Sequence, residues 1–208
     1  RKLNTKVEED PQVQALIDSE TEYVCIVGKS SNLHITKALE TDVDNAISMA
    51  VDTVRFLKEN NRKVFFDAEH FFDGLKENAE VTLKILDSVV KEGVECFIFC
   101  DTNGGTLPHE VTELLNPIIE KYPNQEFGVH FQNDNGCAVT NSLAAVNLGV
   151  KHVQGTMNGY GERTGNADLC TLLPNLSLKM NLETVPEKSL EKLTPIANHI
   201  AELVNIAI

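Results

Sequence analysis

The chain has 208 residues, of which 42% are hydrophobic and 24% charged, enough for one sizeable globular core. Its net charge of −13 argues against a general binder of nucleic acid, although a local basic pocket for one anionic ligand remains open. No apolar run approaches the roughly 20 residues of a membrane span. The N-terminus RKLNTKVEED has no apolar stretch behind its charges, so we expect neither a signal peptide nor a membrane partner.

Short apolar runs alternate along the chain with longer stretches of helical periodicity. After a first helix at 11–19, the predicted strands are 23–28, 63–68, 96–101, 126–131 and 152–157. The other predicted helices cover 41–61 with Thr41 as N-cap, about 77–92, a segment from Pro108, about 138–148, a segment from near Asn166, and an amphipathic stretch after Leu178. Strands that are apolar on both faces and alternate with helices predict an α/β fold with a parallel sheet.

The chain has no linker rich in proline, glycine or serine, so we expect one domain. Its five cysteines form no CxxC pair, and three of them, Cys25, Cys96 and Cys100, lie in apolar runs. This pattern predicts reduced, mostly buried thiols in a cytoplasmic protein rather than a disulfide framework or a zinc site.

Polar residues gather where each predicted strand ends. They are Lys29, Ser30 and Ser31, then Asp67, Glu69 and His70, then Asp101, Thr102 and Asn103, then His130, Gln132, Asn133 and Asp134, and finally Asn158 with the loop GYGERTGN. Ligands of parallel α/β folds bind at the carboxyl ends of the strands. Five polar strand ends in succession therefore predict the rim of an active site.

Each part of this rim also has a purely structural interpretation. Asp67 and Glu69 share one strand face and are either an acid–base pair, metal ligands, or ordinary ion-pair partners. His130 and Gln132 lie two residues apart, so they point to one side and are either metal ligands or the polar end of a buried strand. The glycine-rich loop either cradles an anion or forms a tight turn.

Four segments together resemble a known enzyme family. They are FDAEHFFDG (66–74), CDTNGGTLP (100–108), the stretch 130–147 and QGTMNGYGERTGNADL (154–169). They resemble the 2-isopropylmalate, homocitrate and citramalate synthases, which share an HMG-CoA lyase-like barrel, and the citramalate synthases look most similar. The resemblance implies a (β/α)8 TIM barrel that condenses acetyl-CoA with a 2-oxo acid, with pyruvate expected, in amino-acid biosynthesis. It also implies a divalent metal, Mg, Mn or Zn, and a homodimer when the protein is full length.

The same resemblance assigns roles to individual residues. His130 and Asn166 stand at metal-ligand positions of the family motifs. Glu69 stands at the position of an acid or base acting near the acetyl group. Asp67 is expected to shape the substrate pocket, and Thr102 to bind the substrate carboxylate.

Two departures from the family pattern limit these expectations. Gln132 stands where the family has a second histidine, so this metal position carries a weaker ligand. The motif R-D-G-x-Q of the first family strand does not occur in the chain. We therefore expect the last five or so βα units of an incomplete barrel in residues 1–180, a helical extension in 181–208, and a chain that alone binds metal weakly and does not catalyse the condensation.

Two other functions fit the same residues. One is a metal-dependent carbon–carbon lyase or aldolase on the same barrel. The other is a non-catalytic relative that has lost its metal, which the replacement at Gln132 and the missing R-D-G-x-Q motif favour.

Overall fold

The computed structural model describes residues 1–206 of the chain. Its strands are β1 (Tyr23–Lys29), β2 (Lys63–Glu69), β3 (Cys96–Asp101), β4 (Glu126–Phe131) and β5 (His152–Gln154). Its α-helices are α1 (Pro11–Asp18), α2 (Asn32–Lys37), α3 (Val43–Glu59), α4 (Phe71–Lys91), α5 (Pro108–Lys121), α6 (Ala138–Asn147), α7 (Leu169–Pro174), α8 (Glu187–Leu190) and α9 (Leu193–Val204). Two 3₁₀-helices, η1 (Val7–Glu9) and η2 (Met157–Gly159), and one π-helix, η3 (Asn175–Lys179), complete the order.

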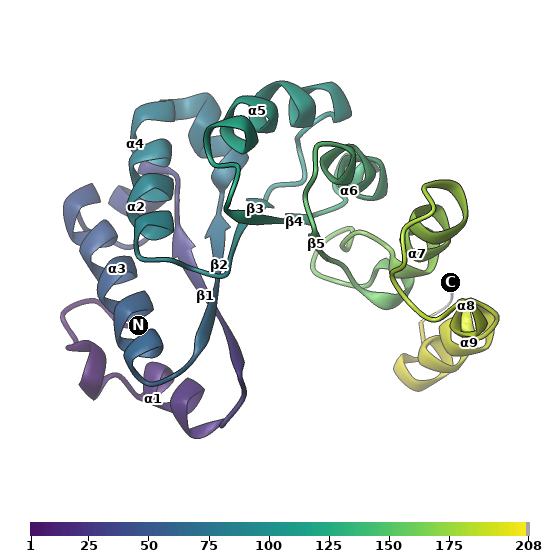
Figure 1. The fold of residues 1–208 in the computed structure, drawn as a ribbon, viewed down its shortest axis with the longest axis horizontal. Helices are drawn as coiled ribbons and strands as arrows, with labels where there is room; N and C mark the ends of the chain where they lie inside the picture. Colours follow the sequence, from purple (N-terminus) through teal and green to yellow (C-terminus); the bar gives the residue numbers. More distant parts are fainter. Residues whose placement is uncertain (207–208) are drawn as a thin grey trace.

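The five strands form one parallel sheet in the order β1-β2-β3-β4-β5, so every strand lies beside its neighbour in sequence. The predicted α/β class and the five βα units are confirmed. Figure 1 shows the sheet curving into an open arch, with the helices on the outer side and the strands lining the inner side. Within residues 1–206, β1 and β5 each pair with one strand only.

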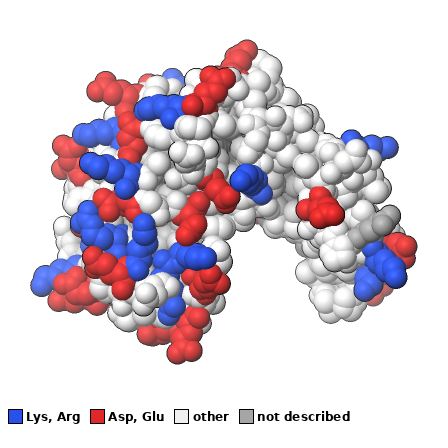
Figure 2. All heavy atoms as spheres, in the orientation of Figure 1, with Lys and Arg blue, Asp and Glu red and all other residues white. Residues whose placement is uncertain are grey.

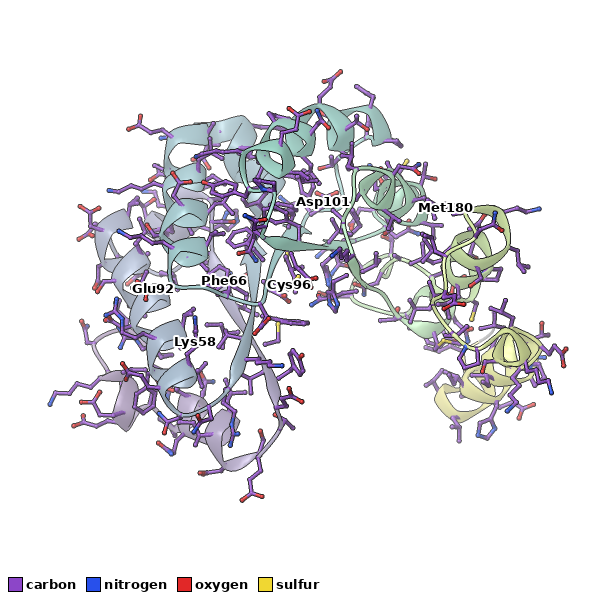
Figure 3. All side chains as sticks on the ribbon, viewed as in Figure 1. Lys58, Phe66, Glu92, Cys96, Asp101 and Met180 are labelled. Carbon is purple, nitrogen blue, oxygen red and sulfur yellow. The ribbon has the colours of Figure 1, made fainter. Side chains whose placement is uncertain are left out.

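The two faces of the sheet carry different side chains because successive residues of a strand point to opposite faces. Val64, Phe66 and Ala68 of β2 belong to the core between sheet and helices. Cys96, Ile98 and Cys100 of β3 form a smaller cluster. Figure 3 shows Phe66 on the helix side of the sheet and Cys96 on the inner side.

Phenylalanine rings fill much of the outer core. Phe71, at the start of α4, lies with its ring centroid 5.7 Å from that of Phe97 and 4.7 Å from that of Phe99 on β3. Phe99 in turn stacks at 4.9 Å on Phe127 of β4. Such pairs add about 0.5–1.5 kcal/mol each beyond the area they bury, so they fix α4 against the centre of the sheet.

Several predicted helix and strand boundaries are wrong. The N-cap of α3 is Asp42 rather than Thr41, because the Asp42 carboxylate accepts the backbone N–H of Asn45 at 2.8 Å. Helix α4 starts at Phe71 rather than near Glu77, and non-helical backbone angles at Asn78 break it into two parts. The periodicity detected only the second part.

The other differences lie near the C-terminus and around the cysteines. Helix α7 begins at Leu169, where the Asp168 carboxylate accepts the N–H of Cys170 at 2.9 Å, rather than near Asn166. The fifth strand ends at Gln154, three residues before the predicted end. All five cysteines are free, as predicted, but the prediction that they are mostly buried is wrong, because only Cys96 and Cys100 are buried, Cys137 and Cys170 are half-buried, and Cys25 is exposed. The short helix α2 had no counterpart in the prediction.

The segment after Lys179 contains the predicted amphipathic helix, α9. Only Ala197 of α9 is buried, whereas Leu203 is 72% exposed. The division into a barrel portion, 1–180, and a helical extension, 181–208, remains a prediction, and its last two residues lie outside the described part. Across residues 1–206, no helix is both long and apolar enough to cross a membrane.

Charged side chains crowd one limb of the arch. In the view of Figure 2, acidic and basic residues interleave over the limb that holds α1 to α4, and the opposite limb carries few. The two signs pair locally, as in Lys84 with Asp44 at 2.6 Å and Arg55 with Glu92 at 3.0 Å. Exposed pairs of this kind contribute little stability.

Gly128 of β4 provides a test of the packing on the inner face. A Cβ there would lie 2.8 Å from Ile98 Cγ1, 3.0 Å from His152 Cδ2 and 3.2 Å from Cys96 Sγ. We expect Gly128→Ala to lower the free energy of unfolding by about 1–3 kcal/mol, because three strands pack around the site. Urea denaturation measures it, with Gly105→Ala as control, since a Cβ at Gly105 meets nothing within 4 Å. Equal stability of the two variants would contradict this account.

Candidate active site

The parallel register brings the polar strand ends to one edge of the inner face. Residues Lys29 and Glu69 are direct register partners on β1 and β2, and His130 and Gln154 are partners on β4 and β5. Each is the last or near-last residue of its strand. The sequence prediction of a polar rim at the carboxyl ends of the strands thus has a counterpart in space.

Glu69 is held at the rim by a basic neighbour. Its Oε2 lies 2.5 Å from Lys29 Nζ, and both side chains are about three-quarters buried. Its other oxygen lies 4.0 Å from Nε2 of His70. The ion pair fixes the orientation of one carboxylate oxygen and leaves Oε1 facing the next residue.

A stacked pair of histidines adjoins Glu69. The rings of His34 and His70 lie 3.5 Å apart at 9°, close to parallel. His34 Nδ1 contacts Ser31 Oγ at 3.1 Å, and His70 Nδ1 contacts Asp73 Oδ2 at 3.0 Å. Burial, followed by the charges of His70 and Lys29, lowers the pKa of His34. This shift favours the neutral form of His34.

Thr102 follows β3 and ties two loops together. Its hydroxyl accepts the backbone N–H of His70 at 2.8 Å, and its carbonyl accepts from Arg163 Nη2 at 2.7 Å. Arg163 also forms a two-pronged ion pair with Asp134, at 2.8 and 2.9 Å. This pair lowers the pKa of Asp134 and joins the glycine-rich loop to the segment after β4. The predicted carboxylate-binding role of Thr102 remains a prediction.

The three predicted metal ligands lie together. His130 Nε2 is 3.4 Å from Gln132 Nε2. Gln132 and Asn166 are paired by an isolated antiparallel bridge, which places the two residues side by side. Gln132 Nε2 also donates to Glu162 Oε1 at 3.0 Å, and Asn166 Nδ2 donates to the carbonyl of Tyr160 at 3.2 Å.

Gln132 offers a test of whether these residues suit a cation. Its side chain is buried, and within residues 1–206 its Oε1 has no hydrogen-bond partner. A buried polar atom without a partner costs about 1–3 kcal/mol, a cost that a bound hard cation would remove. An amide oxygen and an imidazole nitrogen are both groups that can bind a divalent ion.

The same donor set is short of charge. In the described part of the chain, no group of three or more His, Cys, Asp or Glu side chains is arranged to hold a metal. His130, Gln132 and Asn166 are all neutral ligands, so they supply little of the Coulomb attraction that holds a divalent ion. The residues fit part of a metal site, and weak binding of a metal by this chain remains a prediction.

Two inner-face residues were not predicted as part of the site. Gln154 Oε1 lies 2.8 Å from His130 Nδ1, and Gln154 Nε2 lies 3.0 Å from Asp67 Oδ1. Cys25 Sγ lies 3.2 Å from the same Asp67 oxygen. The sequence feature that could have identified Gln154 is its position two residues after His152, since this spacing places both side chains on the same face of β5.

Comparison with known proteins identifies the fold and the relatives of the chain. A model of the HMGL-like family matches residues 5–200. The (R)-citramalate synthase of Aquifex aeolicus is 48% identical over 206 residues, and that of Synechocystis is 41% identical over 216 residues. The structure of the HMG-CoA lyase of Bacillus subtilis superposes with a TM-score of 0.82 at 18% identity, covering 94% of this chain and 68% of the lyase.

The match covers the chain far more fully than it covers the relatives. It includes 99% and 100% of this chain but 39% of each of the two synthases, so the chain spans about two fifths of their length. The lyase comparison, below 25% identity, shows the TIM-barrel fold alone, with this sheet as part of a barrel. By the extent of the family match and the identity to the synthases, the chain belongs to the HMGL-like family.

Proposed function

We propose that the chain is the part of an acyltransferase that carries the acid–base residue and the neutral metal ligands of a citramalate-type synthase. The reaction is the condensation of acetyl-CoA with a 2-oxo acid, with pyruvate as the expected acceptor. The observation that carries the proposal is that His130, Gln132 and Asn166 lie together at the edge of the sheet where the strand that bears Glu69 also ends, in a chain 48% identical to a citramalate synthase. A cytoplasmic homodimer remains a prediction.

Glu69 is the group assigned to the proton transfer. Its carboxylate takes a proton from the methyl group of acetyl-CoA. The resulting enolate carbon forms a bond to the keto carbon of the acceptor, the π bond of that keto group breaks, and its oxygen takes up a proton to become a hydroxyl. Water then cleaves the thioester and releases CoA. Lys29 holds one carboxylate oxygen at 2.5 Å, so the other is the oxygen available to the substrate.

The divalent ion would be held by His130 Nε2 with oxygens of Gln132 and Asn166. When bound, it supplies a positive charge that holds the 2-oxo acid and polarises its keto group. Thr102 is assigned to the acceptor carboxylate, and the Arg163–Asp134 ion pair fixes the adjacent loops. Asp67 is assigned to the shape of the pocket floor, where it contacts Gln154 and Cys25.

The assay is thiol release from acetyl-CoA with pyruvate. It uses the present chain and an extended chain, in which the part of the Aquifex aeolicus synthase that precedes the matched region is joined to this one. We expect release by the extended chain and none by the present chain. Retro-aldol cleavage without thiol release would instead support a lyase.

Glu69→Gln tests the acid–base assignment in the extended chain. We expect thiol release to fall by roughly 10²–10⁴-fold, because an amide cannot accept the methyl proton. Its oxygen can still accept from Lys29, so folding should persist. Glu80→Gln on the exposed face of α4 is the matched control. Retention of the original rate in Glu69→Gln would remove Glu69 from the proton transfer.

A second candidate, a non-catalytic relative, is favoured by Gln132, whose amide is a weaker ligand than imidazole. Gln132→His in the extended chain tests it. On the acyltransferase proposal the extended chain that keeps Gln132 is already active, and the Gln132→His variant binds Mn or Zn more tightly by about tenfold or more. Activity that appears only in Gln132→His would support the non-catalytic relative. Isothermal titration and thiol release measure the two quantities.

Gly161→Ala tests the role of Asn166 in metal binding. A Cβ at Gly161 would lie 1.9 Å from Asn166 Nδ2, so the amide would have to move. We expect the metal affinity of the extended chain to fall by about 10–100-fold, which is the usual loss when a residue that orients a metal ligand is changed. Gly105→Ala again serves as control. An unchanged affinity would argue that Asn166 is no ligand.

A further inference from the structure

Gln154 crosses the inner face of the sheet to join residues of two distant strands. It lies on β5, yet its amide contacts His130 on the adjacent β4 and Asp67 on β2, with β3 between those two strands. Both contacts are short, 2.8 Å to His130 Nδ1 and 3.0 Å to Asp67 Oδ1. None of the roles proposed above uses Gln154.

The chemistry of the three groups determines the direction of these hydrogen bonds. A carboxylate only accepts, so the atom of Gln154 that faces Asp67 is the amide nitrogen. The amide oxygen therefore faces His130, and because oxygen only accepts here, Nδ1 of His130 must carry the hydrogen. A neutral imidazole with its hydrogen on Nδ1 has a free electron pair on Nε2.

The Asp67 end of the chain of contacts is also fixed. Cys25 Sγ lies 3.2 Å from the Asp67 oxygen that receives the Gln154 amide. Desolvation and the Asp67 charge raise the pKa of the Cys25 thiol, so the sulfur keeps its hydrogen and donates it. Two donors on one oxygen hold Asp67 in the orientation that selects the amide nitrogen of Gln154.

The unprotonated nitrogen of His130 faces Gln132. Its Nε2 lies 3.4 Å from Gln132 Nε2, which can donate to it, and Oε1 of the same buried amide has no partner within residues 1–206. With the opposite tautomer, Nε2 would carry a hydrogen and could not bind a cation. Ligating histidines commonly donate their other ring N–H to an oxygen in this manner.

We propose that Gln154 is a positioning residue that, anchored by Asp67, holds His130 in the Nδ1–H tautomer and so presents the Nε2 electron pair to a divalent cation. The tautomer is a property of the chain itself. Only the cation at Nε2 rests on the proposed function.

The pairing of an amide with a carboxylate is essential to this role. A carboxylate at position 154 would place two like charges about 3 Å apart, opposite Asp67 Oδ1. An amide at position 67 could either donate or accept, and it would no longer select one orientation of Gln154. Exchanging the two groups, Gln154→Glu together with Asp67→Asn, restores an acceptor for His130 Nδ1.

The first measurement is the tautomer of His130 in the 208-residue chain, by long-range ¹H–¹⁵N correlation at a pH above the titration range of histidine. We expect the Nδ1–H form in the unchanged chain, a shift toward Nε2–H in Gln154→Leu, and a mixture in Asp67→Asn. The exchanged double variant should return to Nδ1–H. Gln14→Leu, on the exposed face of α1, is the matched control.

The second measurement is the affinity of the extended chain for Co²⁺, followed by its visible absorption. We expect a loss of about 10–100-fold in Gln154→Leu and recovery in the exchanged double variant. An Nε2–H form in the unchanged chain, or no tautomer change in Asp67→Asn, would overturn the proposal. A Gln154→Leu variant with a changed His130 tautomer but an unchanged Co²⁺ affinity would also overturn it. If the extended chain released no thiol, the proposed function would be wrong, but the tautomer measured in the 208-residue chain would still test the role of Gln154.

Discussion

The parallel pairing of five strands in sequential order is the constraint on which the rest of the structure depends. Each βα unit places its strand beside the previous one, so every carboxyl end reaches the same edge. Alternation then divides each strand between a core face and an inner face. Glu69 and His130, which are 61 positions apart in sequence by their numbering, thereby reach one rim.

The rim combines a charged part with a neutral part. Around Glu69, an ion pair and a stack of two histidines fix the side chain. Around His130, the contacts are made by amides, with Gln154 on one ring nitrogen and Gln132 near the other. Neutral amides orient a ligand without adding charge. A cation at His130 would therefore need a negative partner beyond the neutral trio.

Hydrogen bonds between loops fix the charged part of the rim relative to the neutral part. The Thr102 hydroxyl fixes the backbone at His70, and Arg163 links the Thr102 carbonyl to Asp134. Asp101, just before, is buried and accepts the N–H of Thr106 at 3.1 Å, while burial raises its pKa. Hydrogen bonds of this kind fix three loops without a large apolar contribution.

The sequence by itself determined the fold class, the five strands and the candidate rim, because alternating hydrophobic periods and strand-end polarity are local signals. It placed helix boundaries less well, since the caps at Asp42 and Asp168 depend on which oxygen meets a backbone N–H. Only the tertiary structure decided that Gln154 reaches Asp67, because that contact joins strands 87 residues apart. The spacing of residues along a chain does not predict a hydrogen bond between strands that are not neighbours in a curved sheet.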